Sequence, residues 1–232
     1  DLDLAKKFIG GRGLGTKILM DEGIAKVDPL SEQNKLIYIT GPMTGAAVPT
    51  GGRYIVLTKS PLNNMIASSN SGGQWGAHLK YAGWDAIIVE GKSEKPVYLN
   101  IVDEKLEILP AEDMWGKTSE DVDDLLKERH PKCSVLNIGP AVERQSLIAA
   151  IMNDKDRAAG RGGVGAVMGS KNLKAISVTS TKKVMEPFDE EALKEATKDA
   201  NHRIRENGVT SAGLPTYGTA VLVNIINNVG SL

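Results

Sequence analysis

Glycine is concentrated in one short segment, residues 153–171, and this segment constrains the fold more than any other part of the chain. It reads NDKDRAAGRGGVGAVMGSK, with five glycines accompanied by Arg157, Arg161 and Lys171. Glycine loses more conformational entropy on folding than any other residue, so such a cluster needs a compensating interaction. A bulky anion or cofactor that approaches the backbone closely and meets N–H groups and cations there would supply one.

Two further glycine-rich segments have the same character. They are residues 44–54 (TGAAVPTGGRY) and residues 68–76 (SSNSGGQWG). Two of the three segments carry arginine, whose planar guanidinium suits phosphate. Together they predict that the chain binds a large polyanionic cofactor.

Charge and cysteine content exclude several other classes. The 28 basic and 29 acidic side chains leave no net field to attract nucleic acid or an anionic membrane. Cys133 is the single cysteine, which excludes an internal disulfide and a self-contained iron–sulfur or cysteine-rich zinc site. No apolar run is expected to approach the ~18 residues of a membrane span, and no signal-peptide pattern is present. We therefore expect a soluble, cytoplasmic protein with neither a nucleic-acid nor a membrane partner.

The pattern of apolar residues predicts an α+β fold with two β-sheets and a few helices. Runs of strands with only scattered helices favour this class over an alternating parallel sheet. The expected strands are residues 35–40, 54–59, 86–90, 97–103, 134–138, 147–152 and 175–179, with 107–109 pairing back onto 97–103. The expected helices are an amphipathic start containing Leu4 and Phe8, then residues 76–82, 119–129 and 189–207.

A faint internal echo predicts pseudo-duplicated half-domains. Residues 36–42 (LIYITGP) resemble residues 135–140 (VLNIGP), and a further strand and an arginine-bearing glycine-rich loop follow each of them. Duplication would place the two loops symmetrically about one ligand. A match this short also arises by chance, and that alternative stays open.

Two nucleotide-binding motifs compete for the main glycine segment. Residues 160–165 (GRGGVG) satisfy the dinucleotide fingerprint G-x-G-x-x-G. However, polar residues precede them, no long helix is expected before Lys174, and no ribose-binding acid follows. The P-loop interpretation is weaker, because Gly169-Ser170-Lys171 has the wrong order.

The remaining chemistry-bearing residues receive structural interpretations. The histidines are too scattered for a metal site and are expected at the surface or at helix caps. Three helix aspartates are expected to be solvated, the cysteine buried or half-buried, and an aspartate pair in a solvated turn rather than on a cation. Tryptophans are more often core residues than ligand platforms, but Trp75 directly follows a glycine-rich loop, so a role as ligand platform stays open for it. These residues are His78, His130, His202, Asp121, Asp123, Asp124, Cys133, Trp75, Asp154 and Asp156.

Both ends of the chain look cut, which suggests a fragment of a longer polypeptide. The chain opens on Asp1 inside an amphipathic segment and stops soon after the apolar run 219–227. We expect one domain over residues 1–209 and the start of a following helical domain over residues 210–232.

A set of blocks in fixed order resembles one family. The blocks are residues 10–15 (GGRGLG), 50–54 (TGGRY), 70–76 (NSGGQWG), 82–91 (AGWDAIIVEG), 115–117 (WGK), 153–176 and 213–227 (GLPTYGTAVLVNIIN). They are similar to the N-terminal domain of the tungsten-containing aldehyde ferredoxin oxidoreductases over essentially the whole chain. The resemblance implies two sheets, related by pseudo-duplication, that form a base under a tungsten bis-pterin cofactor.

The resemblance also implies which residues meet the cofactor. The pterin and phosphate contacts carry over to Arg53, Asn70, Gly72, Arg157, Ala158 and Gly160. A Mg²⁺ ion bridging the two pterin phosphates would be held partly by the main-chain carbonyls of Asn70 and Ala158. Arginine suits phosphate, and Mg²⁺ prefers oxygen ligands, so these residue types fit the implied chemistry.

The implied reaction of the whole enzyme is oxidation of an aldehyde with water to a carboxylate, with electrons leaving through an iron–sulfur cluster to ferredoxin. The cluster's cysteines and the substrate residues belong to the remaining domains of the polypeptide, so no residue here is assigned a catalytic role. A homodimer is possible. The alternatives are a relative that acts on another carbonyl or a thioester, a non-catalytic pterin-binding or assembly module, and a generic nucleotide-binding domain.

Overall fold

The computed structural model describes residues 2–182 and 185–231. The chain divides into two compact units, one formed by Asp1–Ala46 with Thr50–Met185 and the other by Ala47–Pro49 with Glu186–Leu232. The division at 185/186 lies before the expected boundary at 209/210. That boundary concerns the domains of a longer polypeptide and stays a prediction.

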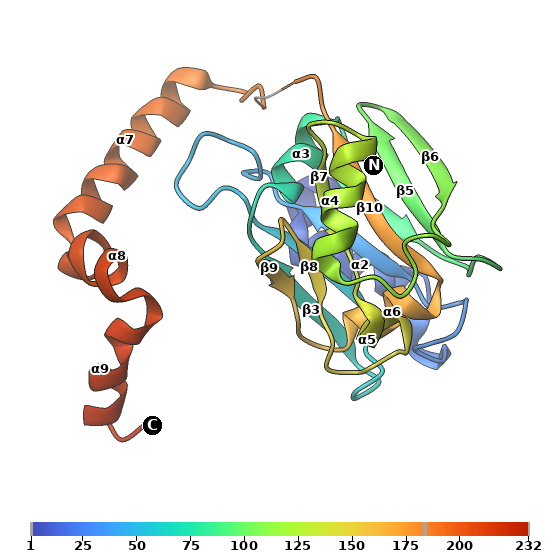
Figure 1. Cartoon of the computed structure of the whole chain (residues 1–232). Helices are drawn as coiled ribbons and strands as arrows, with labels where there is room; N and C mark the ends of the chain where they lie inside the picture. Colours follow the sequence, from blue (N-terminus) through green and yellow to red (C-terminus); the bar gives the residue numbers. More distant parts are fainter. Residues whose placement is uncertain (1, 183–184, 232) are drawn as a thin grey trace. The chain divides into compact units, whose positions relative to one another are not determined.

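The first unit contains all the strands and six α-helices among the described residues (Figure 1). The strands are β1 (Leu36–Thr40), β2 (Tyr54–Lys59), β3 (Ile66–Ser71), β4 (Ala86–Val89), β5 (Val97–Val102), β6 (Lys105–Pro110), β7 (Ser134–Asn137), β8 (Ile151–Asn153), β9 (Arg157–Ala159) and β10 (Leu173–Thr179). The helices are α1 (Leu2–Phe8), α2 (Gly11–Asp21), α3 (Trp75–Tyr81), α4 (Ser119–Arg129), α5 (Pro140–Glu143) and α6 (Val164–Ser170), with a 3₁₀ turn η1 (Ile24–Lys26).

The strands form two sheets, as the α+β prediction requires. The first has the order β3-β2-β1-β4 and is antiparallel throughout. The second has the order β6-β5-β10-β7-β8-β9, in which only the β5–β10 pair is parallel. The predicted return of 107–109 onto 97–103 is confirmed as the β5–β6 hairpin.

The topology confirms the predicted duplication. In the first sheet β1, β2 and β3 form a meander, and α3 then leads to β4, which pairs antiparallel with β1. In the second sheet β7, β8 and β9 form the same meander, and α6 leads to β10, which pairs antiparallel with β7. A helix precedes each meander: α2 contacts β1 and β2, and α4 contacts β7. The short echo between residues 36–42 and 135–140 therefore marks the first strand of each repeat.

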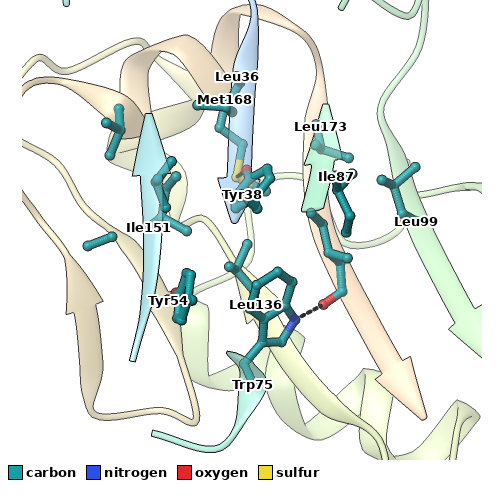
Figure 2. Close-up of a cluster of buried hydrophobic side chains, with 14 of the residues drawn as sticks. Leu36, Tyr38, Tyr54, Trp75, Ile87, Leu99, Leu136, Ile151, Met168 and Leu173 are labelled. Carbon is teal, nitrogen blue, oxygen red and sulfur yellow. Dashed lines mark hydrogen bonds between the residues drawn. The ribbon is translucent and has the colours of Figure 1, made fainter. Parts of the chain in front are cut away.

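The two repeats share one core. Helices α3 and α6 each contact strands of both sheets, and the edge strands β3 and β9 contact each other. Trp75, fully buried on α3, lies 4.8 Å from Tyr54 between ring centroids, and its indole Nε1 donates to the Ile176 carbonyl at 3.2 Å (Figure 2). Trp75 is thus a core residue rather than a ligand platform, and its indole N–H is satisfied by the opposite sheet.

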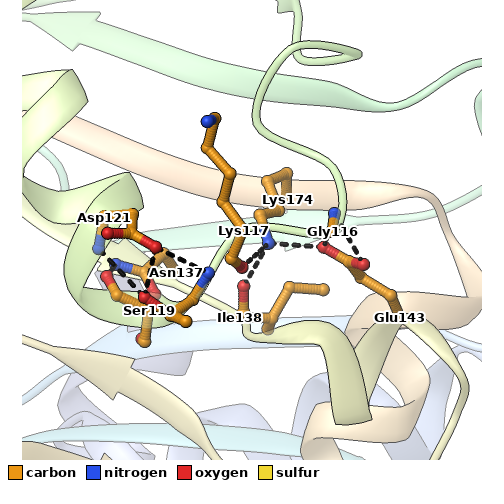
Figure 3. Close-up of polar contacts among 9 residues, drawn as sticks. Gly116, Lys117, Ser119, Asp121, Asn137, Ile138, Glu143 and Lys174 are labelled. Carbon is orange, nitrogen blue, oxygen red and sulfur yellow. Dashed lines mark hydrogen bonds and ion pairs between the residues drawn. The ribbon is translucent and has the colours of Figure 1, made fainter.

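A buried ion pair fixes the 115–118 loop (Figure 3). Lys174 is completely buried on β10, where its ammonium contacts the Glu143 carboxylate and donates to the carbonyls of Ile138 at 2.7 Å and Lys117 at 3.0 Å. Glu143 in turn accepts from the Gly116 N–H at 2.9 Å. The charge is therefore paired and its remaining protons are used, which is the condition under which a buried lysine is tolerated.

Several local expectations were wrong. The strand expected over 147–152 is reduced to β8, because Leu147 and Ile148 lie exposed in a turn. Asp123 is fully buried rather than solvated, because it lies on the inner side of α4 and pairs with Lys127 at 2.6 Å. The strands β3 and β9 and the helices α2, α5 and α6 were not predicted. Their sequences are rich in glycine, serine and alanine, so periodicity gives almost no signal.

Other structural expectations were correct. Asp121 and Asp124 are exposed, Cys133 is buried, and His130 forms the C-terminal cap of α4. His202 is exposed on its helix, near Glu206. The expectation for His78 was wrong, because it lies in the middle of α3 and is partly buried, and this burial lowers its pKa.

The second unit is helical. It contains α7 (Glu190–Glu206), a π-turn η2 (Val209–Gly213), α8 (Leu214–Tyr217), a 3₁₀ turn η3 (Gly218–Leu222) and α9 (Val223–Asn228). By length and composition alone the run Val209–Asn228, with mean hydropathy 1.3, could cross a membrane, so the expectation that no run approaches that length was wrong. None of this run is buried in the structure, and the same composition is found in core helices of larger proteins.

Candidate functional site

Five of the six predicted contact residues line one hollow. Its volume is about 220 Å³, and its lining residues are Arg53, Asn70, Ser71, Gly72, Asp156, Arg157 and Ala158. These residues come from two stretches of sequence, residues 53–72 and 156–158, and meet where the edge strands β3 and β9 lie together. The sixth, Gly160, follows directly after β9 and is exposed, but it does not line the hollow.

The duplication explains why the site residues face each other. Asn70 lies on β3 and Ala158 on β9, which are equivalent strands of the two repeats. In each repeat a glycine follows two positions later, Gly72 in the first and Gly160 in the second. The hollow therefore lies at the junction of the two repeats, as the internal echo predicted for the two loops.

The hollow is lined by guanidinium groups. Arg53 Nη1 donates to Asn70 Oδ1 at 2.7 Å, which leaves its other nitrogens without a partner among the residues that the structure describes. Arg157 Nε lies 3.5 Å from Asp156 Oδ1, and both side chains are more than half exposed. An ion pair between two such exposed side chains contributes little to stability. Arg157 can therefore exchange Asp156 for another anion.

Asn153 joins the two sides of the hollow and was not among the predicted residues. It is fully buried and makes all four hydrogen bonds that an amide side chain allows. Its Oδ1 accepts from the hydroxyls of Tyr54 and Ser71, both at 2.8 Å, and its Nδ2 donates to the Gly72 carbonyl at 3.0 Å and to Asp154 at 2.9 Å. Strand β8 is thereby fixed to β2, to β3 and to the loop that follows β3.

Asp154 fixes the same loop from a second direction. Its Oδ2 accepts from the backbone N–H groups of Gln74 at 2.5 Å and Trp75 at 3.3 Å, at the start of α3. Its Oδ1 accepts from the Ser134 hydroxyl at 2.8 Å. The sequence offered Asp154 only as a cation ligand or a turn residue. An acidic residue that lies between two glycine-rich loops is the sequence signal that could have shown that Asp154 connects them.

Two glycines in the predicted set have open space beside them. A Cβ built on Gly72 would have the Arg53 Nε at 3.9 Å as its nearest atom, and one on Gly160 would meet the Ala150 Cβ at 3.6 Å. Gly73 differs, because its positive φ and the Asp154 oxygen only 2.3 Å from its virtual Cβ exclude a side chain. The wall of the hollow at Gly72 is thus bare backbone next to an arginine, which suits close approach by a flat ligand.

The other glycines of the 153–171 segment allow close packing within the protein itself. The prediction of a bound ligand from the number of glycines is therefore corrected. A Cβ on Gly165 would lie 2.4 Å from the Ala149 carbonyl oxygen, and one on Gly169 would lie 2.1 Å from that of Val142. These glycines let α6 approach α5 and the turn before β8. Close packing therefore compensates much of their entropy, and the cluster by itself does not require a ligand.

The dinucleotide motif also fails in three dimensions. Contrary to expectation, a strand does precede GRGGVG and a helix does follow it, namely β9 and α6. However, β9 is an antiparallel edge strand, and the next strand, β10, lies three positions away in the sheet. The parallel βαβ unit that places a pyrophosphate at a helix N-terminus is therefore absent from the described residues.

The residues present fit a phosphorylated ligand. Arg53 and Arg157 supply donors in fork geometry, and β3 and β9 are edge strands whose outer backbone groups are not all used in ladders. Within residues 2–182 and 185–231, no three His, Cys, Asp or Glu side chains gather as metal ligands. A magnesium ion at this place would accordingly rely on carbonyl and phosphate oxygens, as the resemblance implies.

The fold and the hollow together define a duplicated α+β domain with a polar, arginine-lined site at the junction of its repeats. The chain belongs to the aldehyde ferredoxin oxidoreductase family: the family model "Aldehyde ferredoxin oxidoreductase, N-terminal domain" matches residues 1–180. The family predicted from the ordered glycine-containing blocks is thereby confirmed.

Individual relatives agree with this assignment. The chain is 53% identical over 98% of its length to the tungsten-containing aldehyde ferredoxin oxidoreductase of Pyrococcus horikoshii, and 52% identical over 99% to that of Pyrococcus furiosus. It is also 41% identical over 83% of its length to the P. furiosus protein named aliphatic sulfonate oxidoreductase, WOR-like subunit, of which it covers 33%. The chain spans 38% of the length of the two aldehyde enzymes.

One solved structure is similar over most of the chain. It is the active site complex BamBC of benzoyl coenzyme A reductase in complex with 1,5-dienoyl-CoA, with a TM-score of 0.83 and 37% sequence identity. The match covers 89% of this chain and 32% of that one. The α+β fold with its two sheets is therefore the fold of this family's N-terminal region.

Proposed function

We propose that the hollow between β3 and β9 binds the phosphate and pterin groups of a tungsten bis-pterin cofactor. The carrying observation is that Arg53, Asn70 and Gly72 from one repeat face Arg157 and Ala158 from the other around a single hollow. A ligand made of two similar halves joined at a metal matches a site made of two similar strands. The enzymes of P. horikoshii and P. furiosus, named as tungsten-containing, support the choice of metal.

The residues of this chain would bind and orient the cofactor rather than react. Arg53 and Arg157 would neutralise phosphate charge, Gly72 and Gly160 would leave the backbone accessible to the ring edges, and the carbonyls of Asn70 and Ala158 would help hold a Mg²⁺ ion. When bound, the cofactor supplies the redox chemistry at its metal. Asn153 and Asp154 hold the two walls at a fixed separation.

For the whole polypeptide we propose cytoplasmic oxidation of an aldehyde to a carboxylate, with ferredoxin as electron acceptor and an iron–sulfur cluster held by domains outside this chain. We include in the same proposal that the whole polypeptide forms a homodimer. Apolar side chains exposed on the helical unit would pack against those domains; they are Ile204, Val209, Leu214, Tyr217, Val223, Ile225 and Val229.

A second candidate is a relative with the same cofactor and a different substrate. It is favoured by the similarity to proteins named as an aliphatic sulfonate oxidoreductase and a benzoyl coenzyme A reductase, since the same domain occurs in both. Assays with aldehydes, sulfonates and thioesters on the full-length protein separate the two candidates.

The proposal is tested on anaerobically purified full-length protein by its tungsten, molybdenum, iron, magnesium and pterin content, with Gly72→Val as the site variant. Valine at this position has room in the fold but projects beside Arg53 into the hollow. Gly208→Val is the matched control, because no atom lies within 4 Å of its virtual Cβ and its φ of −60° suits any residue. Loss of pterin and tungsten in the first variant alone is expected. Equal cofactor content in both variants would overturn the assignment of the hollow.

A further inference from the structure

The segment GGRGLG at residues 10–15 has no role in the site described above. It forms the start of α2, and Arg12 in its centre is exposed. Arg12 Nε donates to the Ser68 hydroxyl at 2.9 Å. This contact ties α2 to β3, the edge strand that also carries Asn70.

Arg12 and Arg53 lie side by side along one face of β3. Ser68 and Asn70 are two positions apart on the strand, so their side chains point to the same face about 7 Å apart. Arg12 is bonded to the first and Arg53 to the second. Two arginines are thereby bonded to the same face of β3, although Arg12 itself lines a second hollow, with Phe8 and Lys17, and not the one described above.

This placement is unfavourable within the chain itself. Among the residues that the structure describes, neither arginine forms an ion pair with a carboxylate, and each gives one nitrogen to a neutral oxygen. Arg12 also lies in the first turn of α2, where a cation opposes the helix dipole. The equivalent helix α4 has Glu120 and Asp121 in its first turn. Two unneutralised cations on one face indicate that an anion from outside the chain belongs between them.

We propose that Arg12 is a further binding residue of this site, and that it holds a phosphate group together with Arg53 on the β3 side of the hollow. The inference rests on the proposed function and adds a residue to it. With Nε retained by Ser68, both Nη groups of Arg12 remain to donate to phosphate oxygens. Ser68 then acts as a positioning residue that fixes the plane of the guanidinium.

The test measures binding of inorganic pyrophosphate to the cofactor-free full-length protein by calorimetry, and pterin content after native loading, for the same set of variants. Arg12→Ala should weaken pyrophosphate binding about tenfold, as Arg53→Ala should, because each removes one charge-assisted contact. Arg12→Lys should restore only part of the pyrophosphate affinity that Arg12→Ala loses, since lysine has the positive charge but lacks the planar set of donors of arginine. Ser68→Ala should give a smaller loss. Arg144→Ala is the control: it removes an exposed arginine whose side chain has no partner in the described residues.

The outcomes separate the two proposals. If Arg12→Ala matches Arg144→Ala in both pyrophosphate affinity and pterin content while Arg53→Ala and Arg157→Ala lose both, the role of Arg12 is overturned and the hollow stands. If all four variants behave alike, the hollow itself is not the phosphate site. Unchanged melting temperatures show that each loss is one of binding, and Arg12→Lys keeps the test valid if the alanine variant unfolds.

Discussion

Replacing Asn153 with alanine should damage stability and the site together. The substitution removes four hydrogen bonds and leaves three neutral groups without their partner, namely the buried hydroxyls of Tyr54 and Ser71 and the partly buried carbonyl of Gly72. Each such group costs about 1–3 kcal/mol when it loses its partner, and water entering the polar cavity restores part of this. The loss of unfolding free energy should therefore be about 3–5 kcal/mol.

The assay is urea denaturation followed by tryptophan fluorescence, because Trp75 packs directly on Tyr54. Asn137→Ala is the matched control. Asn137 is also buried, but its side chain makes two hydrogen bonds, both with Ser119, and none with the hollow, so its loss of stability should be smaller. Both variants should lose stability, but only Asn153→Ala should also lose pterin at a temperature where the protein stays folded. A loss of stability below about 1 kcal/mol, the net value of one hydrogen bond, would refute the four-bond account.

Three further predictions concern single side chains. Arg157→Ala should reduce cofactor occupancy by removing a contact of about 1.5–3 kcal/mol, and unchanged tungsten content would contradict its role. Burial lowers the pKa of Lys171 to about 8 from the usual 10.5, so the unfolded chain binds more protons than the native state between these values, and stability rises with pH there. The unfolding free energy relative to Lys171→Met should therefore grow by on the order of 3 kcal/mol between pH 8 and 10.5; a constant difference would exclude the shift. Burial also raises the pKa of the Cys133 thiol to about 11, so it should resist alkylation at neutral pH in native protein and react after unfolding; equal rates in both states would show that it is accessible.

Sequence reasoning succeeded where a residue's chemistry and its local pattern agree. Strands rich in β-branched residues, such as β1 and β2, and the capped helix α4 were predicted nearly to the residue. Apolar periodicity reports burial directly, because a side chain that alternates between core and solvent must alternate in polarity. The same reasoning missed β3 and β9, whose serine, asparagine and alanine residues carry no such alternation.

Those two strands carry the site, and the resemblance to a family identified the residues on them where periodicity did not. The number of glycines was a misleading guide, since Gly165 and Gly169 admit neighbouring backbone rather than a ligand. Asn153 begins the glycine-rich segment 153–171, but nothing in that segment indicates its role. Its importance follows from three partners, Tyr54, Ser71 and Gly72, that are distant in sequence and meet it only after folding.

By itself the sequence determined the α+β class, the family and a set of residues suited to phosphate, because each of these is recorded in residue type and order along the chain. The short echo only suggested the duplication, which the strand order confirms. Only the tertiary structure decided that five of those residues surround one hollow, that Asn153 and Asp154 hold its walls, and that Arg12 and Arg53 bond to the same strand, β3. These facts depend on the contact between edge strands of two separate sheets. That contact arises from packing of α3 and α6 against both sheets, and no local stretch of sequence encodes it.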